Sequence, residues 1–377
     1  MDNSFKQIIS SGLASIFSSN KSSDSALGID IGSSSIKVVQ LRKKKGKAIL
    51  ETYGALSLGP YGKVEVGKAV SLQVEDIVKA LVDAMKESNV TTSSGVISIP
   101  TASSLIFTIS LPASVTEEQL KSVVPMEARK HIPVPISEVT LDWFVIPQEA
   151  EAFEDDTQHT AVKSPDSKIE VLVVAIHNDT LVRYQEILKR TGIHSESFEM
   201  EIFSSIRSSF GHDLAPVLLM DFGASKTKLS IVEAGVVRLF HVVNRGSQDI
   251  TSNIATSTGV SFEEAEKLKR SIGLDERENK DISDIAKLSV DYIFSETNSV
   301  VLAFEKKYNK NISKVVLTGG GSLLKGLLPY ANSSFHTEVF YSNPFSKTEA
   351  PAFLQPVLEI SGPEFAVAVG LALRQLS

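Results

Sequence analysis

Two similar stretches hold the residues that are best suited to phosphate chemistry. Residues Asp30 to Val38 read D-I-G-S-S-S-I-K-V, and residues Asp221 to Leu229 read D-F-G-A-S-K-T-K-L. Both follow a short apolar run and place Asp, Gly, a small residue, Ser and Lys at the same offsets. Backbone N–H groups and the Ser hydroxyl of such a turn can form an anion-binding nest. The Asp can hold Mg²⁺ through water, and the Lys can reach a phosphate. The pattern therefore predicts a ligand that carries phosphate together with a hard metal ion.

The repetition decides between two interpretations of these turns. One such turn alone is more often a plain hairpin. One copy in each half of the chain instead suggests two related lobes that close on one ligand. The candidate ligand-binding residues of the two turns are Asp30, Gly32, Ser33, Ser34, Lys37, Asp221, Gly223, Ser225 and Lys228. Of these, Asp30 and Asp221 are the candidate metal ligands.

A third loop, Thr318-Gly-Gly-Gly-Ser322, follows another short apolar run. Gly321 to Gly326 has the spacing of a P-loop, but Leu327 and Leu328 stand where Lys and Ser or Thr are required. The loop also lacks the last Gly of a Rossmann fingerprint. We expect it to join a strand to a helix N-terminus, where backbone N–H groups favour anions. A flexible turn is the alternative.

The composition indicates a globular protein of two or more domains. The chain has 377 residues, of which 42% are hydrophobic and 22% are charged. The absence of cysteine excludes disulfides and thiolate metal sites, and the net charge of −7 disfavours a general nucleic-acid binder. No apolar run approaches the roughly 20 residues that span a bilayer, and the N-terminus does not resemble a signal peptide. We expect a cytoplasmic protein with no transmembrane segment and no nucleic-acid partner.

Residues 1–26 form a separate segment. Apolar side chains recur in it at helical spacing, at Phe5, Ile8, Ile9, Leu13, Ile16 and Phe17. A linker rich in Ser, Asn and Lys follows at 18–25. The segment is expected either to pack as a helix on the same protein or to be offered to a partner or a membrane surface. Its two cations, Lys6 and Lys21, would attract a membrane only weakly.

Strands and helices must position the three loops. Around the loops we expect strands at 27–29, 95–100, 217–220, 236–243 and 315–317, with a hairpin tip at 43–47. Helices are expected at 74–86, 248–257, 262–271, 282–308 and 363–376. In the last of these helices Ala366 and Gly370 stand four apart, which allows close packing against another helix.

Residues 101–185 are predicted to be a compact insert. Strands are expected at 105–111, 141–146 and 169–176, helices at 116–131 and 180–190, and a polar, acidic loop at 148–168. Thr116 and Gln119 are close to a capping box at the start of the first helix. Pro133 and Pro135 are expected to end that helix, and Gly192 to end the second.

At this point the residues resemble the superfamily of actin, sugar kinases and heat-shock chaperone ATPases. Asp30 to Lys37 and Asp221 to Lys228 look like its two phosphate loops, and Leu317 to Gly326 looks like its adenosine loop. Ala265-Glu-Lys-Leu-Lys269 is similar to the A-E-x-x-K helix that contacts ribose and adenine. Glu201 lies where the resemblance places the first connecting helix, whose Glu can hold a metal-bound water. The resemblance implies ATP and Mg²⁺ as cofactors.

The resemblance also adds residues to the candidate site. It implies further cofactor-binding residues at Glu266, Lys269, Gly319, Gly320, Gly321, Ser322 and Leu323. The resemblance leads us to expect a Gly-Gly pair before the helix at 248–257, but this chain has Gly246-Ser247. Of this pair, Gly246 alone is therefore a candidate cofactor-binding residue. No carboxylate stands out as a catalytic base, and Glu201 is implied only to position a metal-bound water.

Within the superfamily the chain resembles the PilM-type proteins of type IV pilus assembly, from about residue 27 onward. The similar stretches are Gly28 to Leu41, Glu127 to Pro135 with the following Leu141-Asp-Trp143, and Pro363 to Leu373. The most specific part is the insert, a small α/β subdomain of PilM-type and FtsA-type proteins. The resemblance implies a scaffold that binds ATP between two lobes. It also implies a groove beside the insert for the N-terminal cytoplasmic peptide of the membrane protein PilN, at the cytoplasmic face of the inner membrane.

We therefore expect an α/β, actin-like (ribonuclease H-like) two-lobed ATPase fold with an inserted α/β subdomain of the FtsA/PilM type. The expected parts are the segment 1–26, a first lobe at 27–213 with the insert at about 101–185, and a second lobe at 214–377 with an insert at about 261–312. The expected function is an ATP-binding scaffold of pilus assembly with at most slow hydrolysis. Pilus motor ATPases and a second copy of the chain are further candidate partners.

Two alternatives stay open. A small-molecule kinase of the same superfamily would need a base that takes the proton of the acceptor. An FtsA-like protein would form filaments, but FtsA proteins usually carry a basic amphipathic helix at the C-terminus. This chain stops at Ser377, directly after the expected last helix, which favours the PilM type.

Overall fold

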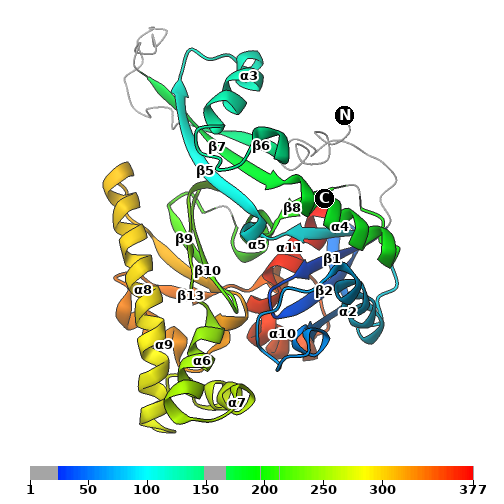
Figure 1. The fold of residues 1–377 in the computed structure, drawn as a ribbon, viewed down its shortest axis with the longest axis vertical. Helices are drawn as coiled ribbons and strands as arrows, with labels where there is room; N and C mark the ends of the chain where they lie inside the picture. Colours follow the sequence, from blue (N-terminus) through cyan, green and yellow to red (C-terminus); the bar gives the residue numbers. More distant parts are fainter. Residues whose placement is uncertain (1–23, 148–166, 196, 212, 377) are drawn as a thin grey trace.

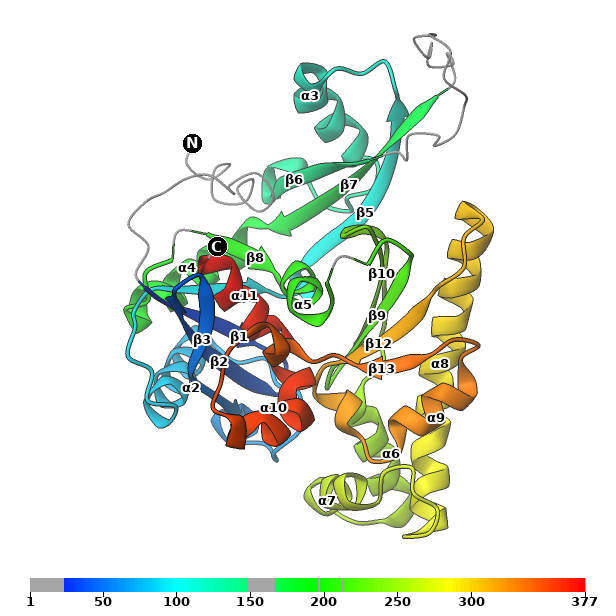
Figure 2. The same cartoon turned by 180° about the vertical axis from the view of Figure 1, so that it is seen from behind.

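The computed structural model describes residues 24–147, 167–195, 197–211 and 213–376. Two five-stranded sheets form the body of the molecule, and a three-stranded sheet stands beyond them at one end (Figure 1; Figure 2 gives the view from behind). Most of the predicted N-terminal segment and the acidic loop at 148–166 lie outside the described residues.

The two five-stranded sheets have the same topology. The first has the order β3-β2-β1-β4-β8 and the second the order β11-β10-β9-β12-β13. In each, the first three strands form an antiparallel meander, and two later strands extend the sheet in parallel beside the first strand. The repeated turns are thus part of two repeated sheets, which confirms the prediction of two related lobes. We call the units built on these sheets the first and second lobes.

The first lobe is interrupted by the insert and completed by the end of the chain. Its strands are β1 (Ser25–Ile31), β2 (Ser35–Lys44), β3 (Lys47–Ser57), β4 (Gly95–Ile99) and β8 (Phe198–Met200). Its helices are α2 (Val74–Glu87), α4 (Asn178–Thr191), α5 (Glu201–Ser209) and α11 (Ala366–Leu376). The hairpin tip predicted at 43–47 is the turn between β2 and β3.

The second lobe carries its helices at one end and along its outer side (Figure 2). Its strands are β9 (Val217–Phe222), β10 (Thr227–Glu233), β11 (Val236–Val243), β12 (Lys314–Thr318) and β13 (Val339–Tyr341). Its helices are α6 (Ser247–Thr258), α7 (Phe262–Ile272), α8 (Lys280–Tyr308) and α9 (Leu327–Ser334), and α10 (Gln355–Ser361) follows on the way back to the first lobe.

The inserted subdomain is a separate antiparallel sheet covered by one helix. Its elements are β5 (Ser104–Pro112), α3 (Glu117–Ala128), β6 (Val139–Ile146) and β7 (Lys168–His177), with the strand order β5-β7-β6. Its own apolar core, which includes Leu120, Val124 and Val173, is distinct from the cores of the two lobes. The short 3₁₀ helix η2 (Thr101–Ser103) joins β4 of the first lobe to β5 of this sheet.

Helices cover both faces of the first sheet. Successive strand residues point to opposite faces, so each strand contributes side chains to the packing on both sides. Leu27, Ile29 and Ile31 of β1 pack in the cluster that includes α2 and α4. On the other face, α11 approaches so closely that a side chain on Gly28 would overlap the carbonyl oxygen of Ala368. A Cβ on Gly370 would likewise overlap the backbone of α5. The close packing predicted for Gly370 is therefore confirmed.

The expectation that no apolar run approaches the length of a membrane span is wrong. The run Ala352–Leu376, which includes α10 and α11, is long and apolar enough to cross a membrane by length and composition. However, 61% of its most apolar window is buried inside the fold. Since α11 packs against β1 and α5, core packing accounts for its apolar character.

Two predicted elements end differently from the prediction. The capping box of Thr116 and Gln119 starts α3 as expected, but the helix ends at Ala128 rather than at residue 131. The N–H groups of Lys130 and His131 donate to carbonyls three residues back, so the last turn is of the 3₁₀ type. The glycine-rich loop does not lead directly into an α-helix: its second half is part of a 3₁₀ helix, η4 (Gly320–Leu323), and α9 starts later, at Leu327. The domain boundaries given above stay a prediction.

Candidate functional site

A cleft of about 630 Å³ lies between the two lobes. This volume is within the usual range for small-molecule and cofactor sites. The repeated turns, the third glycine-rich loop, α7 and the start of α11 all contribute to its wall. The cleft is therefore built from parts of the chain that are far apart in the sequence.

The strand register explains why each turn presents an Asp and a Lys together. Asp30 of β1 pairs directly with Lys37 of β2, and Asp221 of β9 pairs directly with Lys228 of β10. Side chains of directly opposed residues lie on the same face of an antiparallel pair. The seven-residue spacing read from the sequence is thus the spacing that brings the two charges together at the end of the hairpin.

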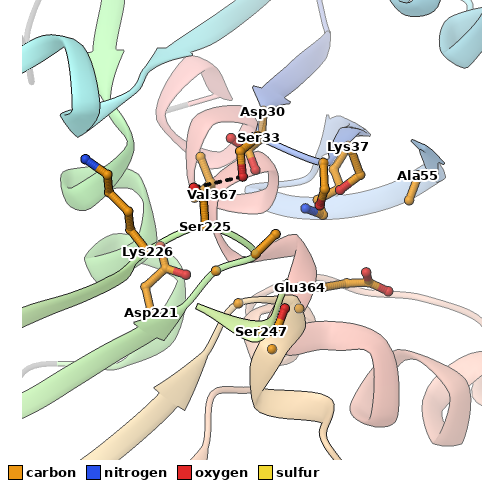
Figure 3. A pocket seen from close by; sticks show the side chains of 18 of the residues that line it. Asp30, Ser33, Lys37, Ala55, Asp221, Ser225, Lys226, Ser247, Glu364 and Val367 are labelled. Atoms are coloured by element: carbon orange, nitrogen blue, oxygen red, sulfur yellow. Dashed lines mark hydrogen bonds between the residues drawn. The ribbon is translucent and has the colours of Figure 1, made fainter. Parts of the chain in front are cut away.

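The two turns have the same internal hydrogen bond and meet each other. The N–H of Gly32 donates to the carbonyl of Ser35, and the N–H of Gly223 donates to the carbonyl of Lys226. The Ser225 hydroxyl donates to Oγ of Ser33 across the cleft at 3.2 Å (Figure 3). The two lobes are therefore in contact through the predicted ligand-binding turns themselves.

Asp30 is the more deeply buried of the two candidate metal ligands. It is 6% exposed, and Oγ of Ser98 donates to its carboxylate at 3.1 Å. Burial raises the pKa of Asp30, and the neighbouring charge of Lys37 opposes this shift without cancelling it. Lys37 also faces Glu364, whose pKa is raised by burial. A cation in the cleft would therefore favour the ionised form of both carboxyls.

Lys228 is held by two carboxylates. Its ammonium donates to Oδ2 of Asp221 and to Oε2 of Glu201, each at 2.8 Å. Oε1 of Glu201 accepts from the N–H and the hydroxyl of Thr101 at 2.7 and 2.6 Å. Burial by itself would raise the pKa of Glu201, but Lys228 and Thr101 outweigh it and lower the pKa. The pKa of Lys228 is raised because its two carboxylate partners outweigh its burial.

The third loop needs its glycines because it packs on the second turn. Gly319 has φ +82°, and a Cβ there would overlap Oδ1 of Asp221 and lie 2.7 Å from the carbonyl oxygen of Phe222. A Cβ on Gly321 would also lie 2.7 Å from that oxygen. On the other side the N–H of Gly319 and the hydroxyl of Thr318 both donate to the carbonyl of Pro363. The loop is thereby fixed between β9 and the segment that leads into α11.

At the outer end of the cleft α7 presents a network of charges. Glu266 accepts from Lys269 at 2.6 Å, from Thr251 at 2.7 Å and from Arg270 at 2.8 Å. Burial would raise the pKa of Glu266, but these partners lower it. Gly67 of the first lobe lies against the Glu266 side chain, with φ +92° and no room for a Cβ without a shift. The two lobes thus also touch at this end.

Most predicted site residues line the cleft. They are Asp30, Gly32, Ser33, Ser34, Lys37, Glu201, Asp221, Gly223, Ser225, Lys228, Glu266, Lys269, Gly319, Gly320, Gly321 and Leu323.

Two predicted residues lie behind the wall instead. A Cβ on Gly246 would overlap the carbonyl oxygen of Ala224, so this glycine supports the second turn from outside the cleft. Ser322 is fully buried, and its hydroxyl donates to the carbonyl of Gly319 at 2.6 Å. Both residues therefore shape the loops rather than face a ligand in the cleft.

The sequence interpretation did not assign several of the lining residues to the site. They include Gly67, Thr101, Ser247, Arg270 and Glu364. Ser247 and Arg270 adjoin predicted residues, so proximity in the sequence could have identified them. Gly67 lies in a loop and Thr101 begins η2, and only the fold brings these two residues to the cleft.

The residues fit a divalent cation that is held mainly through water and phosphate. Asp30 and Asp221 lie in one cleft, which suits a hard cation that prefers oxygen ligands. Lys228 already occupies one oxygen of Asp221, whereas Ser98 is the hydrogen-bond donor to the Asp30 carboxylate. Within the described residues, no group of three His, Asp or Glu side chains could hold a metal by itself. Each of the two carboxylates therefore has one oxygen that accepts a hydrogen bond from a protein donor, Ser98 for Asp30 and Lys228 for Asp221.

Comparisons with solved structures identify the fold. The chain titled "PilM-PilN type IV pilus biogenesis complex" superposes with a TM-score of 0.77 at 22% identity, covering 93% of this chain and 98% of that one. The ethanolamine utilization protein EutJ of Carboxydothermus hydrogenoformans gives a TM-score of 0.52 at 12% identity over 99% of both chains. MreB5 of Spiroplasma citri bound to ADP gives 0.50 at 12% identity, covering 92% of this chain and 95% of that one. The chain has an actin-like, two-lobed α/β fold, as predicted.

Comparisons of sequence identify the family. The cell division protein FtsA of Escherichia coli (strain K12) is 23% identical over 235 residues, which cover 53% of this chain and 54% of FtsA. The chain thus matches about half the length of these curated relatives. The profile of the family described as "Type IV pilus assembly protein PilM" matches residues 28–376, which is nearly the whole chain. The chain belongs to this PilM family of type IV pilus assembly proteins.

Proposed function

We propose that this member of the PilM family binds Mg-ATP between its lobes and works as a nucleotide-dependent scaffold. The observation that carries the proposal is the meeting of two Asp-Gly turns, one from each lobe, across a cleft of about 630 Å³. A protein of the same fold, MreB5, has been solved with ADP bound. The turn chemistry favours phosphate in the middle of this cleft.

Each part of the cleft has a role in this proposal. The N–H groups of the two turns and the ammonium of Lys37 bind the phosphates. The loop around Gly319 and the network around Glu266 lie at the adenosine end. Mg²⁺, when bound, neutralises phosphate charge, and Asp30 and Asp221 hold its water ligands. Binding between the lobes stabilises the closed arrangement because contacts to both turns form only when the lobes are together.

The proposed partner is the N-terminal cytoplasmic peptide of a PilN-type membrane protein. The name of the solved PilM-PilN complex supports this class of partner. Beside the inserted sheet lies a second cavity of about 340 Å³, lined by residues of β6, β7, β10 and β11, by the end of α8 and by Lys310 just after it. Its wall combines apolar Ile146 with charged Arg238 and Glu233, which suits a peptide with mixed side chains. We propose this cavity as part of the peptide site.

The nucleotide cleft and the insert are connected by direct contacts. Glu201 lines the cleft and accepts two hydrogen bonds from Thr101. Thr101 begins η2, which leads directly into β5 of the inserted sheet. A movement of either lobe would therefore displace the residues at the base of the insert. These contacts support a coupling between the two sites. In such a coupling, bound ATP changes the affinity for the peptide, and bound peptide changes the affinity for ATP by the same factor.

The alternatives predict different reactions. A small-molecule kinase would form ADP only when an acceptor is present, whereas the scaffold binds ATP with at most slow turnover. An FtsA-like protein would sediment as filaments with ATP. We also propose, from the family, a position at the cytoplasmic face of the inner membrane near the pilus motor ATPases. Self-association remains a candidate property of the same scaffold.

The peptide site can be tested with two tyrosines of α8. Tyr308 lines the second cavity, whereas Tyr292 on the same helix is 51% exposed and away from it. Fluorescence anisotropy with a labelled PilN-type peptide should show weaker binding to Tyr308→Ala and unchanged binding to Tyr292→Ala. Equal peptide affinity for both variants would place the peptide elsewhere, and no binding to the wild type would exclude this partner.

A further inference from the structure

The two repeated lysines have different surroundings, although they occupy equivalent positions. Each is paired across a hairpin with the Asp of its own turn. Lys228 is bound by Asp221 and Glu201 at 2.8 Å each, and its side chain is 18% exposed. Lys37 lines the cleft, and in the described part of the chain no carboxylate forms an ion pair with it. One lysine is thus directed to the cleft, and the other is occupied by protein carboxylates.

The contact of Lys228 with Glu201 joins the two lobes. Glu201 is the first residue of α5 in the first lobe, and Lys228 belongs to β10 in the second. Glu201 is 7% exposed, and its position is fixed by Thr101 on one oxygen and by Lys228 on the other. The ionised carboxylate offers about four acceptor positions. Protein donors therefore take three of them.

Glu201 is a carboxylate whose position would allow it to act on water. Glu201 lines the cleft between the two phosphate-binding turns. Hydrolysis of ATP is accelerated by an acceptor that orients the attacking water and receives its proton. A carboxylate that is hydrogen-bonded to an ammonium accepts a further proton poorly, because the positive charge stabilises its ionised form. Lys228 therefore opposes this use of Glu201.

We propose that Lys228 is a positioning residue that suppresses ATP hydrolysis by holding Glu201 in its ion pair, so that the scaffold retains bound ATP. This inference rests on the proposed function. In the suppressed step, the water oxygen would bond to the γ-phosphorus while the bond to the β–γ bridging oxygen breaks. The proton of the water would pass to Glu201, and ADP and phosphate would leave. While Lys228 holds Glu201, ATP binds to the cleft without being hydrolysed.

The test replaces the ammonium and measures binding and turnover separately. Lys228→Met removes the charge and keeps most of the side-chain volume. Lys79→Met is the matched control, because Lys79 is exposed on α2, away from the cleft. Calorimetry gives the ATP affinity of each protein, and phosphate release from Mg-ATP under single-turnover conditions gives the rate. General-base catalysis contributes roughly 10²- to 10⁴-fold, so Lys228→Met should release phosphate at least about tenfold faster than the wild type.

The double variant separates the proposed role from a structural one. Adding Glu201→Gln to Lys228→Met should return phosphate release to the wild-type rate, since the gain requires the carboxylate. Because Lys228→Met leaves two carboxylates without their partner, Lys228→Gln serves as a second variant whose amide can still donate hydrogen bonds. A Lys228 variant that binds ATP without any gain in rate would overturn the proposal.

Three further outcomes are informative. If neither Lys228 variant folds in the presence of ATP, the lysine is structural and the proposal is wrong. A gain in rate that survives Glu201→Gln would also overturn it. If the wild type itself fails to bind ATP in the calorimeter, the proposed function fails, and this result is distinguishable from a variant that binds ATP normally.

Discussion

The packing of the third loop on the second turn makes Gly319 the most informative single position in the cleft. In Gly319→Ala the new Cβ would overlap Oδ1 of Asp221 and lie 2.7 Å from the carbonyl oxygen of Phe222, at φ +82°. Gly259 offers a matched control: it has φ +72°, but nothing lies within 4 Å of its Cβ position. Gly259 has ψ 15° in the left-handed region, whereas Gly319 has ψ 159°, a combination with its φ that is essentially restricted to glycine. Gly319→Ala therefore adds a steric conflict to a backbone strain at least as large as that of the control.

The expected magnitudes follow from these two terms. An L-residue in the left-handed region costs roughly 1–2 kcal/mol, so Gly259→Ala should destabilise the protein by about that amount. The backbone conformation of Gly319 costs an L-residue roughly 1–3 kcal/mol and overpacking adds roughly 1–3 kcal/mol, so Gly319→Ala should cost roughly 2–6 kcal/mol in total. Because the loop and Asp221 must move apart, the affinity for Mg-ATP should also fall in Gly319→Ala, by about tenfold or more, which is 1.4 kcal/mol.

Urea unfolding and calorimetric titration of Mg-ATP would measure both effects. We expect Gly259→Ala to show the smaller loss of stability and an unchanged ATP affinity. If the two alanine variants lose stability equally and both bind ATP like the wild type, the contact of this loop with Asp221 is not part of the nucleotide site. Loss of ATP affinity in Gly259→Ala would instead show that general destabilisation, rather than the cleft, controls binding.

Four further predictions follow from the site and the packing. Asp30→Ala or Asp221→Ala should weaken Mg-ATP binding in calorimetry, and undiminished affinity in both variants would refute the site assignment. The lowered pKa of Glu266 means that its contribution to stability is present above its unfolded pKa of about 4.3 and is lost as the pH falls below that value. The melting temperature of Glu266→Gln should therefore fall less than that of the wild type on acidification from about pH 6 to pH 3, and parallel curves would contradict this. Gly370→Ala should strongly lower the melting temperature, because its Cβ would overlap the backbone of α5; a wild-type melting curve would refute this packing. Deletion of residues 1–22 should leave folding and ATP affinity unchanged, and a failure to fold would show that this segment is core.

The repeated turns could be predicted from the sequence because their chemistry depends on local spacing. Asp, Gly and Lys at fixed offsets specify a hairpin in which Asp30 and Lys37 are paired, and the structure has this register. The capping box at Thr116 and the glycine that ends α4, Gly192, are equally local signals, and both are present. The fold class followed from the resemblance, which the duplicated topology and the comparisons bear out.

The remaining features depend on contacts between distant segments. Thr101 reaches the cleft only because β4 and α5 are neighbours in the first lobe, and no sequence pattern marks it. The two lysines occupy equivalent positions in the sequence, but in the described part of the chain it is Lys228 that forms the ion pair with Glu201. Gly246 belongs to the motif but lies behind the wall, because the backbone that comes close to it is that of Ala224 and not a ligand in the cleft.

The central claim is a nucleotide site between the lobes that is coupled to a peptide site beside the insert. The most direct test is calorimetric titration of Mg-ATP into the full chain, alone and with a saturating PilN-type peptide. We predict one ATP per chain, with an affinity that the peptide changes, and a matching change in peptide affinity caused by ATP. A folded chain that binds no ATP would contradict the account, and ATP binding that the peptide leaves unchanged would refute the coupling.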